Sequence, residues 1–97
     1  MKRIDLVVGA RPNFIKAFPL YRALEKTGQF SLRLINTGQH YDKNMADVFF
    51  EQLKMKKPDI NLGIGSGKHG EQTARILVEI EREFLSQKPD LVIVFGD

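Results

Sequence analysis

An apolar run that ends at a glycine and leads directly into a helical pattern most strongly limits the fold of this 97-residue chain. Residues 3–8 are apolar except for Arg3 and Asp5, a composition typical of a parallel strand that is covered on both faces. Gly9 permits a tight turn, and apolar side chains then recur at helical spacing. A strand that leads into a helix N-terminus is a common place for α/β proteins to bind anionic ligands.

The rest of the chain continues to alternate strands with helices. The first helix is predicted to bend or offset its first turn at Pro19 and to stop at Gly28. Residues 30–36 alternate apolar and polar side chains, so we expect this strand to lie toward an edge of the sheet. The later predictions are a helix over 45–53, a short strand over 59–62, a flexible loop over 63–70, a helix over 76–84 and an apolar strand over 91–95. This order predicts an α/β fold with a parallel sheet, right-handed crossovers and helices on both faces.

The position of the apolar strand 91–95 predicts that the domain is partial. A complete parallel sheet would normally cover such a strand with a further helix, so we expect residues 1–97 to form a single, truncated domain. This last strand should lack a neighbour on one side and part of its helical cover. Because an open strand edge invites pairing with another chain, we expect an oligomer or a strand-mediated contact there.

Composition excludes several classes of protein. The chain has no cysteine, hence no disulfide framework and no thiolate metal site. No apolar segment approaches the roughly 18 residues of a membrane span, and the run over 4–8 is too short for a signal peptide, so we expect a cytoplasmic protein with no membrane partner. The net charge is +3, and apart from the short cluster at 54–57 the basic residues are scattered. A nucleic-acid partner is therefore not expected.

The candidate site comes from three loops that leave the carboxyl ends of predicted strands, at 9–13, 37–41 and 96–97. Ligands bind along that edge in open α/β sheets. Arg11 offers a planar fork that matches phosphate oxygens, and Lys16 offers a mobile point charge. The alternative is a solvent-exposed arginine in an ordinary turn. One glycine is far short of a dinucleotide fingerprint, and no Walker-type sequence is present.

Other residues at these loops carry weaker signals. The Gly-x-Gly-x-Gly sequence at 63–67 suggests a nucleotide loop, but no long strand precedes it, so a flexible connection is favoured. His40 and His69 lie in different predicted loops without metal-ligand spacing to carboxylates, and no metal is expected. Gln39 and His40 gain weight from their place on the functional edge. Asp97 follows an apolar strand there, a common position for a catalytic carboxylate.

Taken in order, these motifs resemble the non-hydrolysing UDP-N-acetylglucosamine 2-epimerase family. The matching pieces are Gly-Ala-Arg-Pro-Asn-Phe-Ile-Lys at 9–16, Pro-Leu at 19–20, Thr-Gly-Gln-His at 37–40, Glu-Gln-Thr-Ala-Arg at 71–75, Lys-Pro-Asp at 88–90 and Gly-Asp at 96–97. The resemblance implies an isomerase that interconverts UDP-N-acetylglucosamine and UDP-N-acetylmannosamine for surface polysaccharide. It further implies two Rossmann-like domains in the GT-B arrangement, with the active site between them. This chain would be the first part of the N-terminal domain and inactive alone, because the second, UDP-binding domain is absent.

The resemblance also implies the reaction steps. UDP is eliminated across C1–C2 to give a bound 2-acetamidoglucal, which is protonated on the opposite face and recombines with UDP, without metal or other cofactor. Cations at a helix N-terminus suit the departing diphosphate, and carboxylates with tuned pKa values suit proton transfer at carbon. Carried over by position, Asp97 and Lys16 are the candidate catalytic residues. Gly9, Arg11, Pro12 and Lys16 are the candidate substrate contacts.

Two features concern a second ligand and a departure from the family. Gln39 and His40 match a loop that in some bacterial members contributes to a regulatory UDP-sugar site, although the loop over 63–70 does not match the basic residue that some members use for that ligand. Many members have glutamate where this chain has Asn13.

The alternatives left open are a hydrolysing relative that releases UDP, a GT-B glycosyltransferase and a non-enzymatic flavodoxin-like binding module. Analysis of the reaction products distinguishes the enzymes from one another. A stable monomer whose sheet is fully covered by helices would favour the flavodoxin-like binding module.

Overall fold

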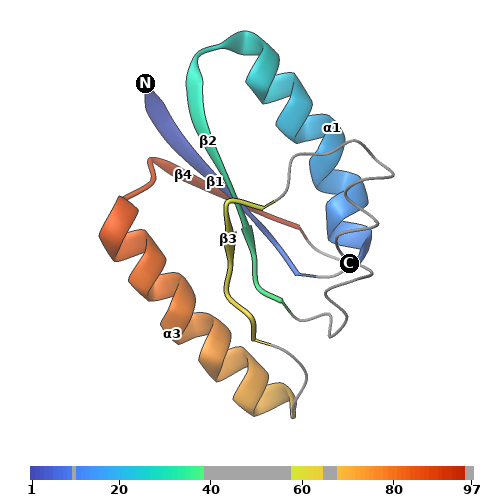
Figure 1. Ribbon diagram of the computed structural model, residues 1–97, viewed down its shortest axis with the longest axis vertical. Helices are drawn as coiled ribbons and strands as arrows, with labels where there is room; N and C mark the ends of the chain where they lie inside the picture. The colour runs from blue at the N-terminus through green and yellow to red at the C-terminus, as the bar shows by residue number, and fades with distance from the viewer. Residues whose placement is uncertain (10, 39–57, 65–67, 96–97) are drawn as a thin grey trace.

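The computed structural model describes residues 1–9, 11–38, 58–64 and 68–95, without the side chains of Arg11, Pro12 and Phe14 (Figure 1). The predicted helix over 45–53 therefore lies outside the described residues. In chain order the elements are β1 (Lys2–Val8), α1 (Arg11–Thr27), β2 (Phe30–Asn36), β3 (Ile60–Asn61), α3 (His69–Gln87) and β4 (Leu91–Val94).

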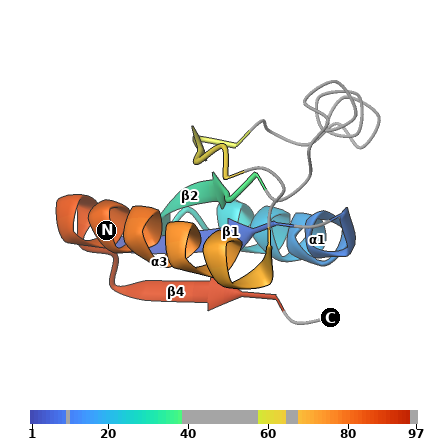
Figure 2. The ribbon, with the colours of Figure 1, turned by 90° about the horizontal axis from the view of Figure 1, so that it is seen from below.

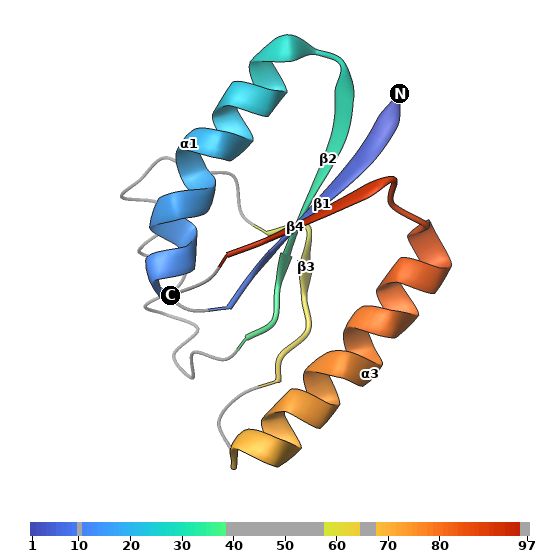
Figure 3. The same cartoon turned by 180° about the vertical axis from the view of Figure 1, so that it is seen from behind.

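The four strands form one parallel sheet in the order β3-β2-β1-β4. Val8 of β1 pairs with Asn36 of β2, and Asn36 pairs with Asn61 of β3, so three strands end in one row. Figure 2 shows the strands one below another, with β4 at the lower edge. The two helices lie on opposite sides of the sheet (Figures 1 and 3). The predicted α/β fold, with a parallel sheet and a helix on each face, is confirmed.

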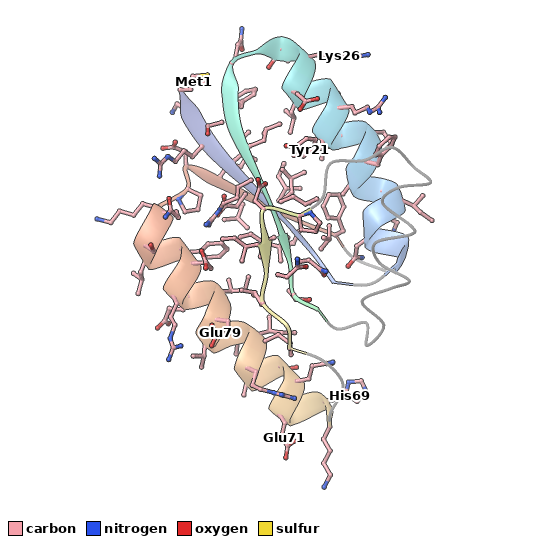
Figure 4. All side chains as sticks on the ribbon, viewed as in Figure 1. Met1, Tyr21, Lys26, His69, Glu71 and Glu79 are labelled. Atoms are coloured by element: carbon pink, nitrogen blue, oxygen red, sulfur yellow. The ribbon has the colours of Figure 1, made fainter. Side chains whose placement is uncertain are left out.

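The apolar core lies between α1 and the sheet. Every second residue of β1 faces α1, and the buried apolar cluster there combines side chains of β1, β2 and α1: Ile4, Leu6, Val8, Leu34, Ala17 and Tyr21. Tyr21 points from α1 toward the sheet in Figure 4. Burial of these side chains fixes α1 against the strands and therefore fixes where its first turn begins.

The opposite face of the sheet carries an ion-pair network instead. Asp5 of β1 is only 3% exposed, and Arg33 of β2 donates to both of its carboxylate oxygens, from Nε at 3.0 Å and from Nη2 at 2.7 Å. The remaining Nη1 donates to Glu83 of α3 at 2.8 Å. The hydrogen bonds that Arg33 donates to Asp5 raise the pKa of Arg33 above its ordinary value, so the guanidinium stays charged. This network links α3, which has no fully buried residue, to the sheet.

The alternation of polar and apolar side chains in β2 therefore has a different explanation from the one predicted. We expected the alternating pattern over 30–36 to mark a strand toward an edge, but β2 has neighbours on both sides. It pairs with β1 along its whole length and with β3 at Ile35 and Asn36. β2 thus lies next to the edge strand, and its alternating polarity arises because Arg33 faces α3 and pairs with charged partners.

Helix boundaries agree with most signals in the sequence. α1 passes through the exposed Pro19 without ending, and it stops at Gly28, which has a positive φ of 65°. α3 begins at His69, which corrects the prediction that the loop extends to residue 70. The N–H groups of the first helical residues have no acceptor within the helix. The negative charge of Glu71 in the first turn of α3 complements the positive end of the helix dipole there.

The last described strand lies at an open edge. Within the described ranges β4 pairs only with β1, and Leu91 and Val94 are 53% and 71% exposed. This confirms the predicted missing neighbour for that part of the chain, while the oligomer expected there stays a prediction. Among the described residues, no helix combines the length and the apolar character needed to span a membrane.

Candidate functional site

The carboxyl ends of β1, β2 and β3 are joined by backbone hydrogen bonds into one continuous edge. The N–H of Thr37 donates to the carbonyl of Val8 at 2.9 Å, and the N–H of Leu62 donates to the carbonyl of Asn36 at 2.8 Å. The N–H of Ile64 then donates to the carbonyl of Thr37 at 3.0 Å. The segments that leave these three strands therefore start from fixed positions, side by side.

Gly38 sets the path of the segment that follows β2. Its φ is +78°, and a Cβ atom there would lie 3.0 Å from both Cα and N of Gly63. Only glycine fits a left-handed conformation with so close a backbone neighbour. The ends of β2 and β3 are thus held against each other directly before residue 39.

Polar side chains reinforce the same edge. The amide of Asn36 donates from Nδ2 to Oδ1 of Asn61 at 2.9 Å, and its own Oδ1 accepts the N–H of Gly38 at 3.1 Å. The hydroxyl of Thr37 is buried and has no hydrogen-bond partner among the described residues. The hydrogen bonds of Asn36 therefore hold the carboxyl ends of β2 and β3 together.

The turn between β1 and α1 is closed by a side chain. Gly9 follows β1 directly and is buried, and its N–H donates to Oδ1 of Asn13 at 3.0 Å. Asn13 is the third residue of α1 and is 8% exposed. A polar side chain at this position that reaches back to a preceding N–H resembles one half of a capping box. Sequence reasoning noted Asn13 only as a departure from the family, although its position at the helix start was the available signal.

The electrostatic character of this turn is positive. The first turn of α1 contains no acidic residue, and the sequence has no Asp or Glu between Asp5 and Glu25. Lys16 lies exposed in the second turn. The positive end of the helix dipole therefore adds to the charges of Arg11 and Lys16, a combination that favours a polyanionic ligand.

The predicted site residues are described to different extents. Gly9 follows β1 directly, and its N–H is paired with Oδ1 of Asn13. Arg11 and Pro12 are the first two residues of α1, and their side chains lie outside the description. Lys16 follows in the next turn.

The remaining predicted residues lie outside the described ranges. They are Gln39, His40 and Asp97, each of which follows a strand that ends at this edge or next to it. His69 lies at the first residue of α3, the lower end of that helix in Figure 4. Among the described residues, no group of three His, Cys, Asp or Glu side chains is placed to hold a metal ion.

Sequence comparisons find close relatives over the whole chain. The model of a family described as UDP-N-acetylglucosamine 2-epimerase matches residues 22–97. The chain is 50% identical over 95 residues to the UDP-N-acetylglucosamine 2-epimerase of Methanocaldococcus jannaschii and 52% identical over 97 residues to that of Methanococcus maripaludis. It is 46% identical over 95 residues to the UDP-2,3-diacetamido-2,3-dideoxy-D-glucuronate 2-epimerase of Pseudomonas aeruginosa. These matches cover 98–100% of this chain but only 26–27% of the relatives, so the chain spans about a quarter of their length.

Structural comparisons give the same relationship. The crystal structure of the Methanocaldococcus jannaschii enzyme in complex with UDP-GlcNAc and UDP matches 98% of this chain and 26% of that one, with a TM-score of 0.90 and 49% identity. The more distant enzyme from Rickettsia bellii, at 27% identity, matches 100% of this chain and 25% of that one, with a TM-score of 0.86. The fold is therefore shared between relatives that differ at most positions.

Proposed function

The chain belongs to the UDP-N-acetylglucosamine 2-epimerase family, and we propose that the complete protein interconverts UDP-N-acetylglucosamine and UDP-N-acetylmannosamine. The observation that carries this proposal is the identity of 50–52% to two archaeal enzymes of that name over essentially the whole chain. The reaction is elimination of UDP across C1–C2, followed by re-addition after protonation at C2. Residues 1–97 form part of the N-terminal domain, and the isolated chain is inactive because the UDP-binding domain lies outside it.

The basic turn after β1 binds the diphosphate of the substrate in this proposal. Elimination develops negative charge on the leaving UDP, which preorganised cations and a helix N-terminus stabilise. Arg11 contributes a bidentate fork and Lys16 a point charge, one turn further along the helix. Gly9 and Pro12 shape the turn at the sugar or diphosphate, and the sequence has no Asp or Glu between Asp5 and Glu25.

Proton transfer at C2 falls to carboxylates, of which this chain supplies Asp97. Asp97 follows β4, and β4 pairs with β1, so the proposed acid or base and the basic turn follow neighbouring strands. Lys16 assists by holding the departing UDP. Gln39 and His40, after β2, form the candidate loop for a regulatory UDP-sugar. The protein acts in the cytoplasm as a homo-oligomer and supplies N-acetylmannosamine for polysaccharide.

A second substrate is favoured by one observation. The Pseudomonas aeruginosa relative, which is named for UDP-2,3-diacetamido-2,3-dideoxy-D-glucuronate, is 46% identical to this chain, only a little less than the archaeal relatives. The same elimination and re-addition at C2 would serve that sugar. Parallel assays with both UDP-sugars decide between them through the ratio of kcat/KM.

The proposal is tested on the full-length protein with UDP-N-acetylglucosamine in deuterated water. The expected product is UDP-N-acetylmannosamine, with deuterium at C2 of the product. Release of free N-acetylmannosamine with UDP would instead indicate a hydrolysing enzyme, and transfer of the sugar to an acceptor a glycosyltransferase. No turnover of either UDP-sugar would contradict the proposal.

The role of the basic turn is tested by charge removal with a control on the same helix. We expect Arg11→Ala and Lys16→Ala each to lower kcat/KM about 100-fold, because each removes a cation from the departing diphosphate. The matched control is Lys26→Ala, since Lys26 is an exposed lysine in the last turn of α1, at its far end in Figure 4. This control should change kcat/KM less than about twofold.

A further inference from the structure

We propose that Asn13 is a positioning residue for the epimerase reaction: its side-chain oxygen holds the β1–α1 turn and thereby fixes the first turn of the helix that carries Arg11 and Lys16. The inference rests on the proposed function, because those two cations are the proposed contacts of UDP. Asn13 itself is not assigned a contact with substrate.

The geometry of the turn carries the first step. The N–H of the buried Gly9 donates to Oδ1 of Asn13 at 3.0 Å, and Asn13 is 8% exposed. The carbonyl of Val8, one residue earlier, accepts the N–H of Thr37 at 2.9 Å. The end of β1 is thus held from two sides, by β2 through Val8 and by α1 through Asn13.

The position of Asn13 within α1 carries the second step. Arg11 lies two residues before it and Lys16 lies three residues after it, so all three belong to the first two turns of one helix. The body of α1 is fixed by the burial of Ala17 and Tyr21 against the sheet. The start of the helix has no comparable apolar contact among its described side chains, because Ile15 and Lys16 are exposed. The hydrogen bond of Asn13 therefore holds a part of α1 where the other described side chains, Ile15 and Lys16, are not buried in the core.

The hydrogen bond between Gly9 and Asn13 requires an acceptor oxygen at position 13 but does not require that the side chain be uncharged. Gly9 needs an oxygen that accepts its N–H, and a carboxamide or a carboxylate can supply it. We therefore infer that the acceptor at Asn13 is required, whereas its neutrality is not.

The experiment compares three variants of the full-length protein with UDP-N-acetylglucosamine as substrate. We expect Asn13→Ala to lower kcat/KM about 30-fold, mainly through kcat, because small displacements of catalytic groups have large effects on rate. Asn13→Asp keeps the acceptor and should stay within about fivefold of the unaltered protein.

Asn61→Ala is the matched control. Asn61 also supplies a side-chain oxygen at the carboxyl edge, where it accepts Nδ2 of Asn36 at 2.9 Å, but no basic helix follows its strand directly. This variant should lose thermal stability to a similar extent, a few degrees in Tm, yet keep kcat/KM within about twofold. If Asn13→Ala loses activity and Asn61→Ala does not, the loss results from a displaced first turn of α1 and not from lower stability.

Hydrogen–deuterium exchange of the peptide over residues 6–17 provides a readout independent of activity. Asn13→Ala should accelerate exchange in this peptide and leave other peptides unchanged, and Asn13→Asp should restore slow exchange. If the alanine variant does not fold, Asn13→Leu, which has nearly the same shape without an acceptor, replaces it. Full activity without the acceptor, or an aspartate variant as inactive as the alanine variant, would overturn the inference. If the unaltered protein turns over no UDP-sugar, the proposed function fails, while the exchange measurement still decides whether Asn13 holds the turn.

Discussion

Asp59 and Leu34 form a closed hydrogen-bonded pair: the N–H of Leu34 donates to Oδ2 of Asp59 at 2.7 Å, and the N–H of Asp59 donates to the carbonyl of Leu34 at 2.9 Å. Asp90 forms the same pair with Arg3, at 2.7 and 2.9 Å. Both aspartates follow Lys-Pro in the sequence and directly precede a strand, β3 or β4. The two edge strands of the described sheet therefore begin with the same device, which sets their register against β2 and β1.

The first prediction concerns this pair. Asp59→Ala and Asp90→Ala should each lower the free energy of unfolding by about 1 kcal/mol, because each removes one hydrogen bond to the backbone. Asp59→Asn and Asp90→Asn keep an acceptor oxygen and should lose less. Urea denaturation of the full-length variants measures the difference. Equal losses in the alanine and asparagine variants would show that the acceptor does not matter.

The second prediction concerns the ion pairs beneath α3. Arg33→Met leaves the buried carboxylate of Asp5 without its partner and should cost about 3 kcal/mol of stability. Glu83→Gln should cost less, since the Glu83 side chain is 26% exposed. The double variant Asp5→Leu with Arg33→Met removes both charges and should regain most of the loss. A double variant less stable than Arg33→Met alone would contradict this account.

The third prediction is the pH dependence of the same pair. The hydrogen bond to Asp5 raises the pKa of Arg33 in the folded state above its ordinary value, so the stability that this pair contributes is fully present at neutral and moderately alkaline pH and is lost only as the pH rises through the raised pKa of the folded state. The stability difference between the unaltered protein and Arg33→Met should therefore stay constant from about pH 7 to 10. On alkaline titration, Arg33→Lys should begin to lose stability at a lower pH than the unaltered protein, because a lysine ordinarily deprotonates near pH 10.4. Parallel alkaline melts compare the two.

The fourth prediction concerns the glycines. Gly38→Ala should destabilise the protein by about 2 kcal/mol or more, because it adds a Cβ atom 3.0 Å from Gly63 to a residue with positive φ. Gly70→Ala is the matched control, since Gly70 lies in α3 and, apart from its chain neighbours and the backbone of its own helix, no described atom lies within 4 Å of the added Cβ. The control should be neutral or slightly stabilising, by up to about 0.5 kcal/mol. Thermal denaturation ranks the two, and equal values would contradict the close approach.

The fifth prediction concerns the buried hydroxyl of Thr37. Within the described residues this hydroxyl has no hydrogen-bond partner, and burying it costs free energy. Thr37→Val replaces it by a methyl group of similar shape and should raise stability by about 1 kcal/mol. A fall in Tm would show instead that the hydroxyl is paired in the complete protein.

Much of the fold was predictable because local signals and packing agree. The helix stop at Gly28 follows from its conformational freedom, and the alternation of strands and helices allows few arrangements other than a parallel sheet. The predicted loop boundary at residue 70 was wrong, and the polar side chains of residues 30–36 have a different origin from the one predicted, although β2 does lie next to an edge strand. A loop and a first helical turn both fit the residues around His69, and the structure shows the helical turn. An edge strand and an internal strand with a buried ion pair both fit the alternation over 30–36, and the contact of Arg33 with Asp5 explains the polar residue.

Part of the candidate site was equally accessible to sequence reasoning. The turn after Gly9 and the cations at Arg11 and Lys16 stand out because they are adjacent in the chain. Asn13 does not, because an asparagine has several roles and its bond to Gly9 appears only when the helix start is placed. The assignments of Gln39, His40 and Asp97 stay predictions.

The sequence by itself determined the elements, the parallel class of the sheet and the basic turn, since hydrophobic periodicity and turn residues act over a few neighbouring positions. Only the tertiary structure decided the strand order, the pairing of Asp5 with Arg33 and the close approach of Gly38 to Gly63. Each of these joins residues more than 20 positions apart. Their free energy depends on distances that exist only after the strands have paired, so no local pattern encodes it.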